Sequence, residues 1–343
     1  MSTAARPVKC LTGATASNLP FDELFAGEEP VLLRGAVSEW PLVRMSDAGS
    51  ATVADRLKDL AADHPLAAFA APPDTAGRFH YSPSVDGMNF SVQRMTLREF
   101  LDQLLAQLDN DDATRLYAGS TDIDAYLPGL RSENDLALDH PDFAHKPSLA
   151  SIWIGNRTTA PAHFDISNNL ACVVAGHRRF TLFPPEQVVN LYPGPLEPTP
   201  AGQVVSMVDL HNPDLAKYPR VERALESALV AEMEPGDVLY FPALWWHQVE
   251  ALDAFNVMIN YWWNATPAFC DTPETTLLHA ILSLRDRPQR EKQAWRTLFD
   301  YYIFGDASLP ARHLPEHAQG ALGTIDDMKA RRLRAQILNR INR

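Results

Sequence analysis

The segment His163–Asn169, with the sequence HFDISNN, holds the pattern on which the fold assignment depends. On a β-strand, residues i and i+2 point to the same face, so His163 and Asp165 present an imidazole and a carboxylate to one point. The pair follows a strand-like run at 151–155 and an Ala-Pro turn at 160–161. This arrangement favours a metal site inside a small β-barrel.

A His-x-Asp pattern is weak evidence by itself, because a chain with 11 histidines is expected to contain one by chance. A second copy, His140-Pro141-Asp142, illustrates the point. It contains a proline and lies in a polar segment, which favours a surface loop without a metal role.

A third candidate ligand, His247, lies in the aromatic run Trp245-Trp246-His247, after a Pro-Gly-Asp turn at 235–237 and an apolar strand at 238–242. Taken alone, it fits a core histidine bonded to a backbone carbonyl. Together with His163 and Asp165 it completes two histidines and one carboxylate, the ligand set of Fe(II) oxygenases, which leaves open positions on the metal. We therefore predict an Fe(II) site formed by these three residues.

Longer stretches of the chain resemble the JmjC-type, cupin-like hydroxylases, among them the asparaginyl hydroxylase that inhibits hypoxia-inducible factor. The resembling stretches are His163–Asn169, Gly176–Pro185, Leu191–Pro193, Pro235–Tyr240, Trp245–His247 and Asn260–Trp262, with Pro30–Pro41 as an N-terminal block. The resemblance covers roughly residues 20–265. It implies a double-stranded β-helix fold, Fe(II) as cofactor, and 2-oxoglutarate and O2 as co-substrates of a hydroxylation.

The resemblance also implies which residues bind 2-oxoglutarate. Arg178 stands where the family has a lysine that neutralises the distal carboxylate, and Arg179 is the alternative. Tyr117 matches a tyrosine whose hydroxyl reaches the same carboxylate, and Asn169 and Asn260 match polar residues of the family's pocket. Each has a structural alternative: the arginines as a solvated hairpin, the tyrosine as a core residue, and the asparagines as partners of barrel backbone groups.

Two departures from the family leave other functions open. Arginine and lysine are not equivalent at position 178, and Ala160 lacks a hydroxyl that the asparaginyl hydroxylase has. The second hypothesis is therefore a catalytically silent, cupin-like regulatory protein that binds a metal or a ligand. A third is a cupin-like isomerase or hydrolase with another metal, although no extra ligand is evident near His163 or His247.

The order of elements predicts a mainly β fold with helical flanks: a double-stranded β-helix (jelly-roll, cupin) core plus C-terminal helices. We expect N-terminal strands and helices at 1–112, the JmjC/cupin-like core at 113–270 and a helical region at 271–343. Predicted strands are Leu149–Gly155, Leu170–Val174, Phe180–Phe183, Val204–Val208, Leu229–Met233, Val238–Phe241 and Val257–Trp263. Predicted helices are Phe21–Ala26, Ala51–Ala62, one opened by Thr96 as N-cap with Glu99, Glu274–Leu284, Gln289–Phe304 and Ile325–Ile341.

Bulk properties narrow the partners and the compartment. The net charge of −13 argues against nucleic acid, and no run approaches the roughly 18 apolar residues of a membrane span. Three scattered cysteines and an N-terminus without an apolar signal sequence predict a cytoplasmic protein.

The C-terminal helix carries an apolar stripe of Leu333, Ile337, Leu338 and Ile341. Since C-terminal helices often pair two subunits in the resembling family, we expect a homodimer, with packing within one chain as the alternative. The substrate, a protein side chain or a small molecule, is selected by loops near 72–92, 120–148 and 195–225.

Overall fold

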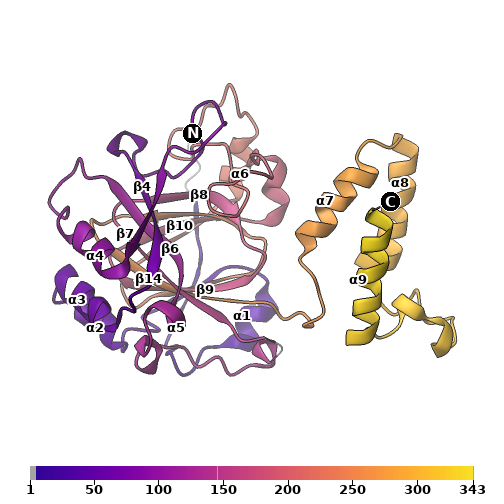
Figure 1. The fold of residues 1–343 in the computed structure, drawn as a ribbon, viewed down its shortest axis with the longest axis horizontal. Coiled ribbons are helices and arrows are strands. Elements are labelled where there is room, and N and C mark those ends of the chain that lie inside the picture. The colour runs from indigo at the N-terminus through magenta and orange to yellow at the C-terminus, as the bar shows by residue number, and fades with distance from the viewer. Residues whose placement is uncertain (1–4, 145, 343) are drawn as a thin grey trace. The chain divides into compact units, whose positions relative to one another are not determined.

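The computed structural model describes residues 5–144 and 146–342. The chain forms two compact units, Met1–Ala265 and Thr266–Arg343 (Figure 1). The first contains two β-sheets with helices, and the second is helical.

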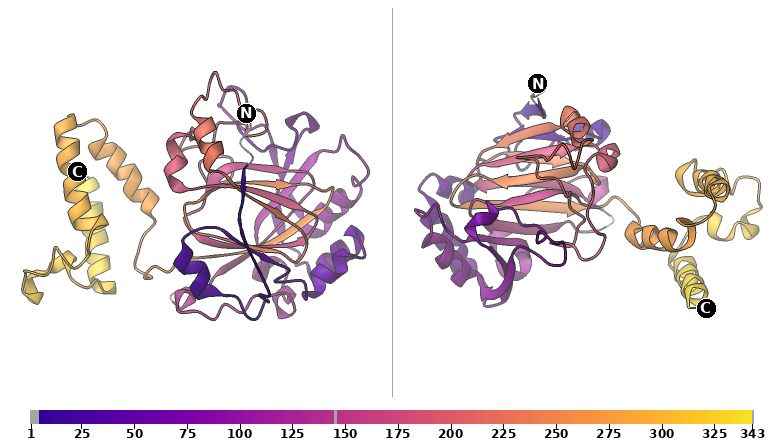
Figure 2. Two further views of the ribbon diagram at one scale, coloured as in Figure 1. Left: turned by 180° about the vertical axis from the view of Figure 1, so that it is seen from behind. Right: turned by 90° about the horizontal axis from the view of Figure 1, so that it is seen from above.

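Two sheets face each other across a shared core in the larger unit (Figure 2). The five-stranded sheet has the order β1 (Arg6–Pro7), β11 (Leu229–Met233), β10 (Arg178–Phe183), β13 (Trp246–Ala251) and β8 (Thr159–Phe164). The nine-stranded sheet has the order β2 (Lys9–Thr12), β3 (Val31–Arg34), β12 (Val238–Phe241), β9 (Asn168–Ala175), β14 (Asn256–Trp263), β7 (Leu149–Gly155), β6 (Arg115–Asp122), β4 (Pro65–Ala71) and β5 (Ser91–Thr96). Apart from the parallel pairs β1–β11 and β2–β3, neighbouring strands are antiparallel. The predicted jelly-roll class is confirmed.

The central strand β9 shows why the sequence pattern here is continuous rather than alternating. Ala171 and Val173 point into the core between the sheets. Cys172 and Val174 point the other way, into a second core beneath the helices. Because both faces are buried, nearly every position of β9 is apolar.

Short helices cover the outer faces of the sheets. They are α1 (Phe21–Gly27), α2 (Pro41–Ser46), α3 (Ser50–Leu60), α4 (Leu97–Leu105), α5 (Ile123–Tyr126) and α6 (Val221–Ser227). Helix α4 begins with the predicted capping box, in which Thr96 and Glu99 bond to each other's backbone N–H. Helices α1 to α5 contribute to the core on the nine-stranded sheet, whereas α6 packs with Trp246 and Phe183 of the other sheet.

Two strand predictions need correction. Val204–Val208 forms only isolated bridges, from Val205 to His163 and from Ser206 to Pro193, because single residues of this loop pair on two sides. The predicted strands also omit several strands that the structure contains, and in one of them, β13, the buried polar residues Gln248 and Glu250 hide the apolar pattern.

The smaller unit comprises α7 (Pro273–Leu284), α8 (Gln289–Phe299) with a π-helical turn at Asp300–Phe304, and α9 (Asp327–Ile341). Arg334 of α9 forms an ion pair with Asp271 at 2.9 Å within this unit. In the part of the chain that the structure describes, no helix has the length and apolar character to cross a membrane.

Candidate metal centre

The three predicted ligands come together at one end of the space between the sheets. His163 on β8 lies directly across from His247 on β13, and their ring centroids are 4.3 Å apart. The Asp165 carboxylate lies 3.6 Å from Nε2 of His247. One ligand atom from each residue lies within 4.8 Å of the others, and among residues 5–144 and 146–342 no other such group of three is found.

Asp165 lies beside the two histidines as predicted, but strand alternation, the reason given for its position, is wrong. Strand β8 ends at Phe164, so strand alternation does not orient the carboxylate. Instead the backbone carbonyl of Asp165 accepts a hydrogen bond of 2.8 Å from the N–H of Leu244, in the loop before β13. This bond ties the turn after β8 to the segment that carries His247.

Backbone carbonyls orient both imidazoles. Nδ1 of His163 lies 2.7 Å from the carbonyl of Pro161, and Nδ1 of His247 lies 3.0 Å from that of Trp245. A carbonyl only accepts, so each Nδ1 carries the proton and each Nε2 offers its lone pair. Orientation of this kind is usual for histidines that bind metals.

The electrostatics suit a metal better than an ion pair. Burial, with His163 nearby, holds the pKa of His247 well below its usual value, so this imidazole is neutral. Burial also raises the pKa of Asp165, while His163 opposes the rise. Two imidazoles and one carboxylate are donors that Fe(II) accepts, so the residues present fit this metal.

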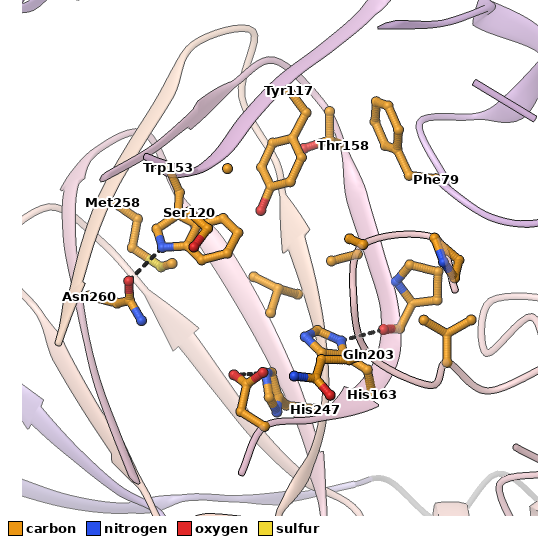
Figure 3. Close-up of a pocket in the computed structure, with 18 of the residues that line it drawn as sticks. Phe79, Tyr117, Ser120, Trp153, Thr158, His163, Gln203, His247, Met258 and Asn260 are labelled. Carbon is orange, nitrogen blue, oxygen red and sulfur yellow. Dashed lines mark hydrogen bonds and ion pairs between the residues drawn. The ribbon is translucent and has the colours of Figure 1, made fainter. Parts of the chain in front are cut away.

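A cavity of about 440 Å³ opens above the three residues (Figure 3). Apart from Asp165, and the two histidines, its lining is uncharged. Aromatic side chains dominate it: Phe69, Phe79, Phe90, Tyr117, Trp153, Phe180, Phe241 and Trp262. The cavity can therefore exclude water from a bound ligand.

The structure brings three of the four predicted co-substrate residues to the cavity wall: Tyr117, Asn169 and Asn260. The Tyr117 hydroxyl points into the cavity, and burial raises its pKa to about 12, so it remains a hydrogen-bond donor (Figure 3). Arg178 lies next to the wall rather than on it, with Nη2 at 3.4 Å from the carbonyl of Trp153.

Arg178 is a buried cation, only 1% exposed. It has no carboxylate partner among the described residues, and its Nε has no hydrogen-bond partner there either. Burial lowers the pKa of its guanidinium, and neighbouring Tyr117 counteracts this. Such a group favours an anionic ligand nearby. Arg179, the alternative, points to the outer face and pairs with Glu232 at 2.6 Å.

Sequence reasoning missed several lining residues. Thr158 presents a hydroxyl near Tyr117 and directly precedes β8, so strand alternation does not reveal its orientation (Figure 3). Trp153 was assigned to a strand but to no site. Gln203 and Ser120 come from loops, whose conformation the sequence pattern does not reveal.

The three segments predicted to select the substrate differ in how much of the cavity they line. Segments 72–92 and 195–225 both line the cavity, whereas Ser120 is the only lining residue from 120–148 among those that the structure describes. The other His-x-Asp copy is a loop, as predicted: His140 caps a helical turn, accepting from the N–H of Asp142, and lies edge-on to Phe25.

Comparison with known proteins agrees with this site. Residues 17–269 match the family described as the cupin-like domain. The lysine-specific demethylase JMJ31 of Arabidopsis thaliana is 35% identical over 128 residues, covering 36% of this chain and 23% of that protein. Human HSPB1-associated protein 1 is 34% identical over 151 residues, which cover 43% of this chain and 30% of that protein. Human tRNA wybutosine-synthesizing protein 5 is 37% identical over 108 residues, which cover 32% of this chain and 31% of that protein.

The matched segments thus span less than a third of these relatives' own lengths. The family match, in contrast, covers most of this chain, with all three candidate ligands and every strand of the two sheets except β1 and β2. This protein belongs to the cupin-like domain family, with relatives of the JmjC type.

Proposed function

We propose that this protein is an Fe(II)- and 2-oxoglutarate-dependent oxygenase that hydroxylates a C–H bond of its substrate. The observation that carries the proposal is the convergence of two Nε2 atoms and one carboxylate at the base of a largely apolar cavity. His163, Asp165 and His247 would hold the iron on one side and leave its other positions to ligands.

When bound, iron supplies the activation of O2, with 2-oxoglutarate oxidised to succinate and CO2. The chain's own residues hold and orient the reactants. The carbonyls of Pro161 and Trp245 keep the two imidazoles in one tautomer. The aromatic lining keeps water away, which strengthens every polar contact inside.

For 2-oxoglutarate, we assign the distal carboxylate to the end of the cavity where Tyr117 and Thr158 lie (Figure 3). The Tyr117 hydroxyl would donate to it, and the guanidinium of Arg178 would neutralise it. The Thr158 hydroxyl stands in for the one that Ala160 lacks. Asn169 and Asn260 would face the end nearer the metal.

One observation favours the alternative of a silent, metal-binding regulatory protein: Arg178 is not part of the cavity wall. A charge behind the wall attracts a carboxylate less strongly than a direct, bidentate contact. This alternative shares the metal site and differs only in whether 2-oxoglutarate binds there productively.

The substrate of the proposed hydroxylation would be a protein side chain or a small molecule. Two relatives are named for lysine demethylation and for the synthesis of a modified tRNA base, which are different substrates. A net charge of −13 disfavours nucleic acid for this chain.

Anaerobic titration separates the two functions. Adding Fe(II) and 2-oxoglutarate to the full chain should produce a visible charge-transfer band, whereas Fe(II) with succinate, which lacks the keto oxygen, should not. Admitting O2 should then yield succinate from 2-oxoglutarate. Stoichiometric iron without the band would contradict the proposal and support the silent protein.

We also propose that the helical unit Thr266–Arg343 pairs two copies of the chain. Only Pro310, Ala311 and Ala330 are buried among its described apolar residues. Large apolar side chains lie exposed on all its helices, including Leu277, Leu282, Phe304, Ile337 and Leu338. So much exposed apolar surface is typical of a subunit interface.

A further inference from the structure

A chain of hydrogen bonds crosses three neighbouring strands at the cavity wall. The indole Nε1 of Trp153 on β7 donates to Oδ1 of Asn260 on β14 at 2.6 Å. Nδ2 of Asn260 then donates to Oδ1 of Asn169 on β9 at 3.2 Å. All three side chains line the cavity, and Figure 3 shows the first bond.

The indole sets the direction of this chain. An indole N–H only donates, so it determines which end of the Asn260 amide faces it. The NH2 group of Asn260 must then point to Asn169, whose carbonyl oxygen is occupied in turn. The NH2 group of Asn169 has no partner among the described residues and remains free to donate to a ligand in the cavity.

Without the indole N–H, nothing in this chain of bonds distinguishes the two ends of either amide. Both amides could rotate and present carbonyl oxygens instead, which repel a carboxylate. The orientation of two neutral amides therefore decides whether this wall attracts or repels an anion.

Close packing holds Trp153 in place. A Cβ on Gly119 would lie 2.6 Å from the indole ring, so only glycine lets the ring lie so near β6. The Trp262 ring packs edge-on against it, with centroids 5.5 Å apart. The backbone carbonyl of Trp153 also receives Nη2 of Arg178. One residue thus contacts both the amide pair and the buried cation.

We propose that Trp153 is a positioning residue for carboxylate binding: it orients Asn260 and Asn169 so that an NH2 group faces the 2-oxoglutarate carboxylate near the metal. This inference rests on the proposed function. It assigns the role to a hydrogen bond, not to the bulk of the ring.

Trp153→Phe tests it, because phenylalanine keeps an aromatic ring and removes the N–H. In the full chain loaded with Fe(II) without O2, the 2-oxoglutarate concentration at half-maximal charge-transfer absorbance should rise about tenfold, the effect of one lost hydrogen bond to a charged group. Iron stoichiometry should stay at the wild-type level. In the aerobic reaction, KM for 2-oxoglutarate should rise while kcat at saturation changes little.

Trp40→Phe is the matched control. Its indole Nε1 is also buried, has no partner among the described residues, and lies in the core beneath the helices. This variant should bind 2-oxoglutarate as the wild type does. Should Trp153→Phe fail to fold, Asn260→Leu breaks the same chain of bonds and should weaken binding equally.

The double variant that combines Trp153→Phe with Asn260→Leu should bind 2-oxoglutarate no more weakly than the weaker-binding of the two single variants. Both changes act through one amide, so their effects do not add. Wild-type affinity in Trp153→Phe, with iron and the absorbance band intact, would overturn the inference and leave the proposed function standing. Absence of the band in the wild type would overturn the proposed function and this inference with it.

Discussion

Arg178 and Arg179 are neighbours in the chain, yet they point to opposite faces of β10. Arg178 is buried beside Tyr117 and Trp153, whereas Arg179 reaches Glu232 on the outside of the sheet. Because strand residues alternate, one step along the chain separates a buried cation next to the cavity wall from one on the outer face of the sheet.

This pair provides a matched test of co-substrate binding. Arg178→Met removes the buried charge and should raise KM for 2-oxoglutarate by about tenfold to a hundredfold, the range for lost charge-assisted hydrogen bonds. Arg178→Lys should recover part of the loss, because lysine keeps the charge without the planar fork. Arg179→Met is the control and should leave KM within about twofold. The assignment is wrong if the two methionine variants behave alike.

Removing a ligand should abolish iron binding. His163→Ala or His247→Ala leaves one imidazole and one carboxylate, too few donors to retain Fe(II) through desalting. We expect elemental analysis to show that iron per chain falls from about one to near zero, because binding one iron ion requires all three ligands. His177→Ala, at an exposed histidine, should keep its iron. Stoichiometric iron in His163→Ala would contradict the site.

Sequence reasoning selected the three residues that the structure brings together, because residue type and spacing carry metal-binding chemistry. His163 and His247 are remote in the chain but occupy one register position of paired strands. The sequence motifs around the two histidines identify them as candidate ligands without any knowledge of the strand pairing. The central apolar strands were equally visible, since burial of both faces leaves unbroken apolar runs such as β9.

The cavity wall was less predictable, for physical reasons. Alternation shows that Arg178 and Arg179 diverge, but register with β11 and β13 decides which one is inside. The bond from Trp153 to Asn260 depends on pairing of β7 with β14. Gln203 lies in a loop held by tertiary contacts such as that of the Tyr81 hydroxyl with Pro198. No local pattern encodes those contacts.

The buried Asp237 should be important for stability. It is 1% exposed and accepts hydrogen bonds from Arg34 and from the N–H groups of Gly35 and Glu234. Asp237→Ala leaves these donors unpaired and should lower the free energy of unfolding by about 3 kcal/mol in urea denaturation. Asp63→Ala breaks the exposed pair with Arg98 and should change it little. If the two variants lost the same free energy of unfolding, the proposed importance of the buried Asp237 for stability would be wrong.

His80 should make stability depend on pH. Burial and the charge of Arg78 lower the pKa of His80 to about 4, and its Nε2 donates to the carbonyl of Ser206. Below its ordinary pKa of 6.5, the unfolded chain binds the proton and the folded chain does not. Stability is therefore complete above pH 6.5 and falls as the pH drops toward 4, by roughly 3 kcal/mol.

The measurement is urea denaturation of the wild type and of His80→Gln, which keeps a donor for Ser206 and does not titrate. The stability difference between them should shrink as the pH falls from 7 to 4.5. A constant difference over this range would mean that His80 is not held neutral in the folded state.

Charge placed on the apolar surface of α9 should separate the proposed dimer. Ile337 and Leu338 are 52% and 60% exposed in the single chain, so replacing either with aspartate costs little within one copy. In a dimer the same change would bury an unpaired carboxylate at the interface. Light scattering should give twice the chain mass for the wild type and one chain mass for Leu338→Asp. Gln336→Asp, a change at another exposed position of the same helix, should stay dimeric. A wild type of single mass, or a Leu338→Asp variant that keeps double mass, would contradict pairing through this helix.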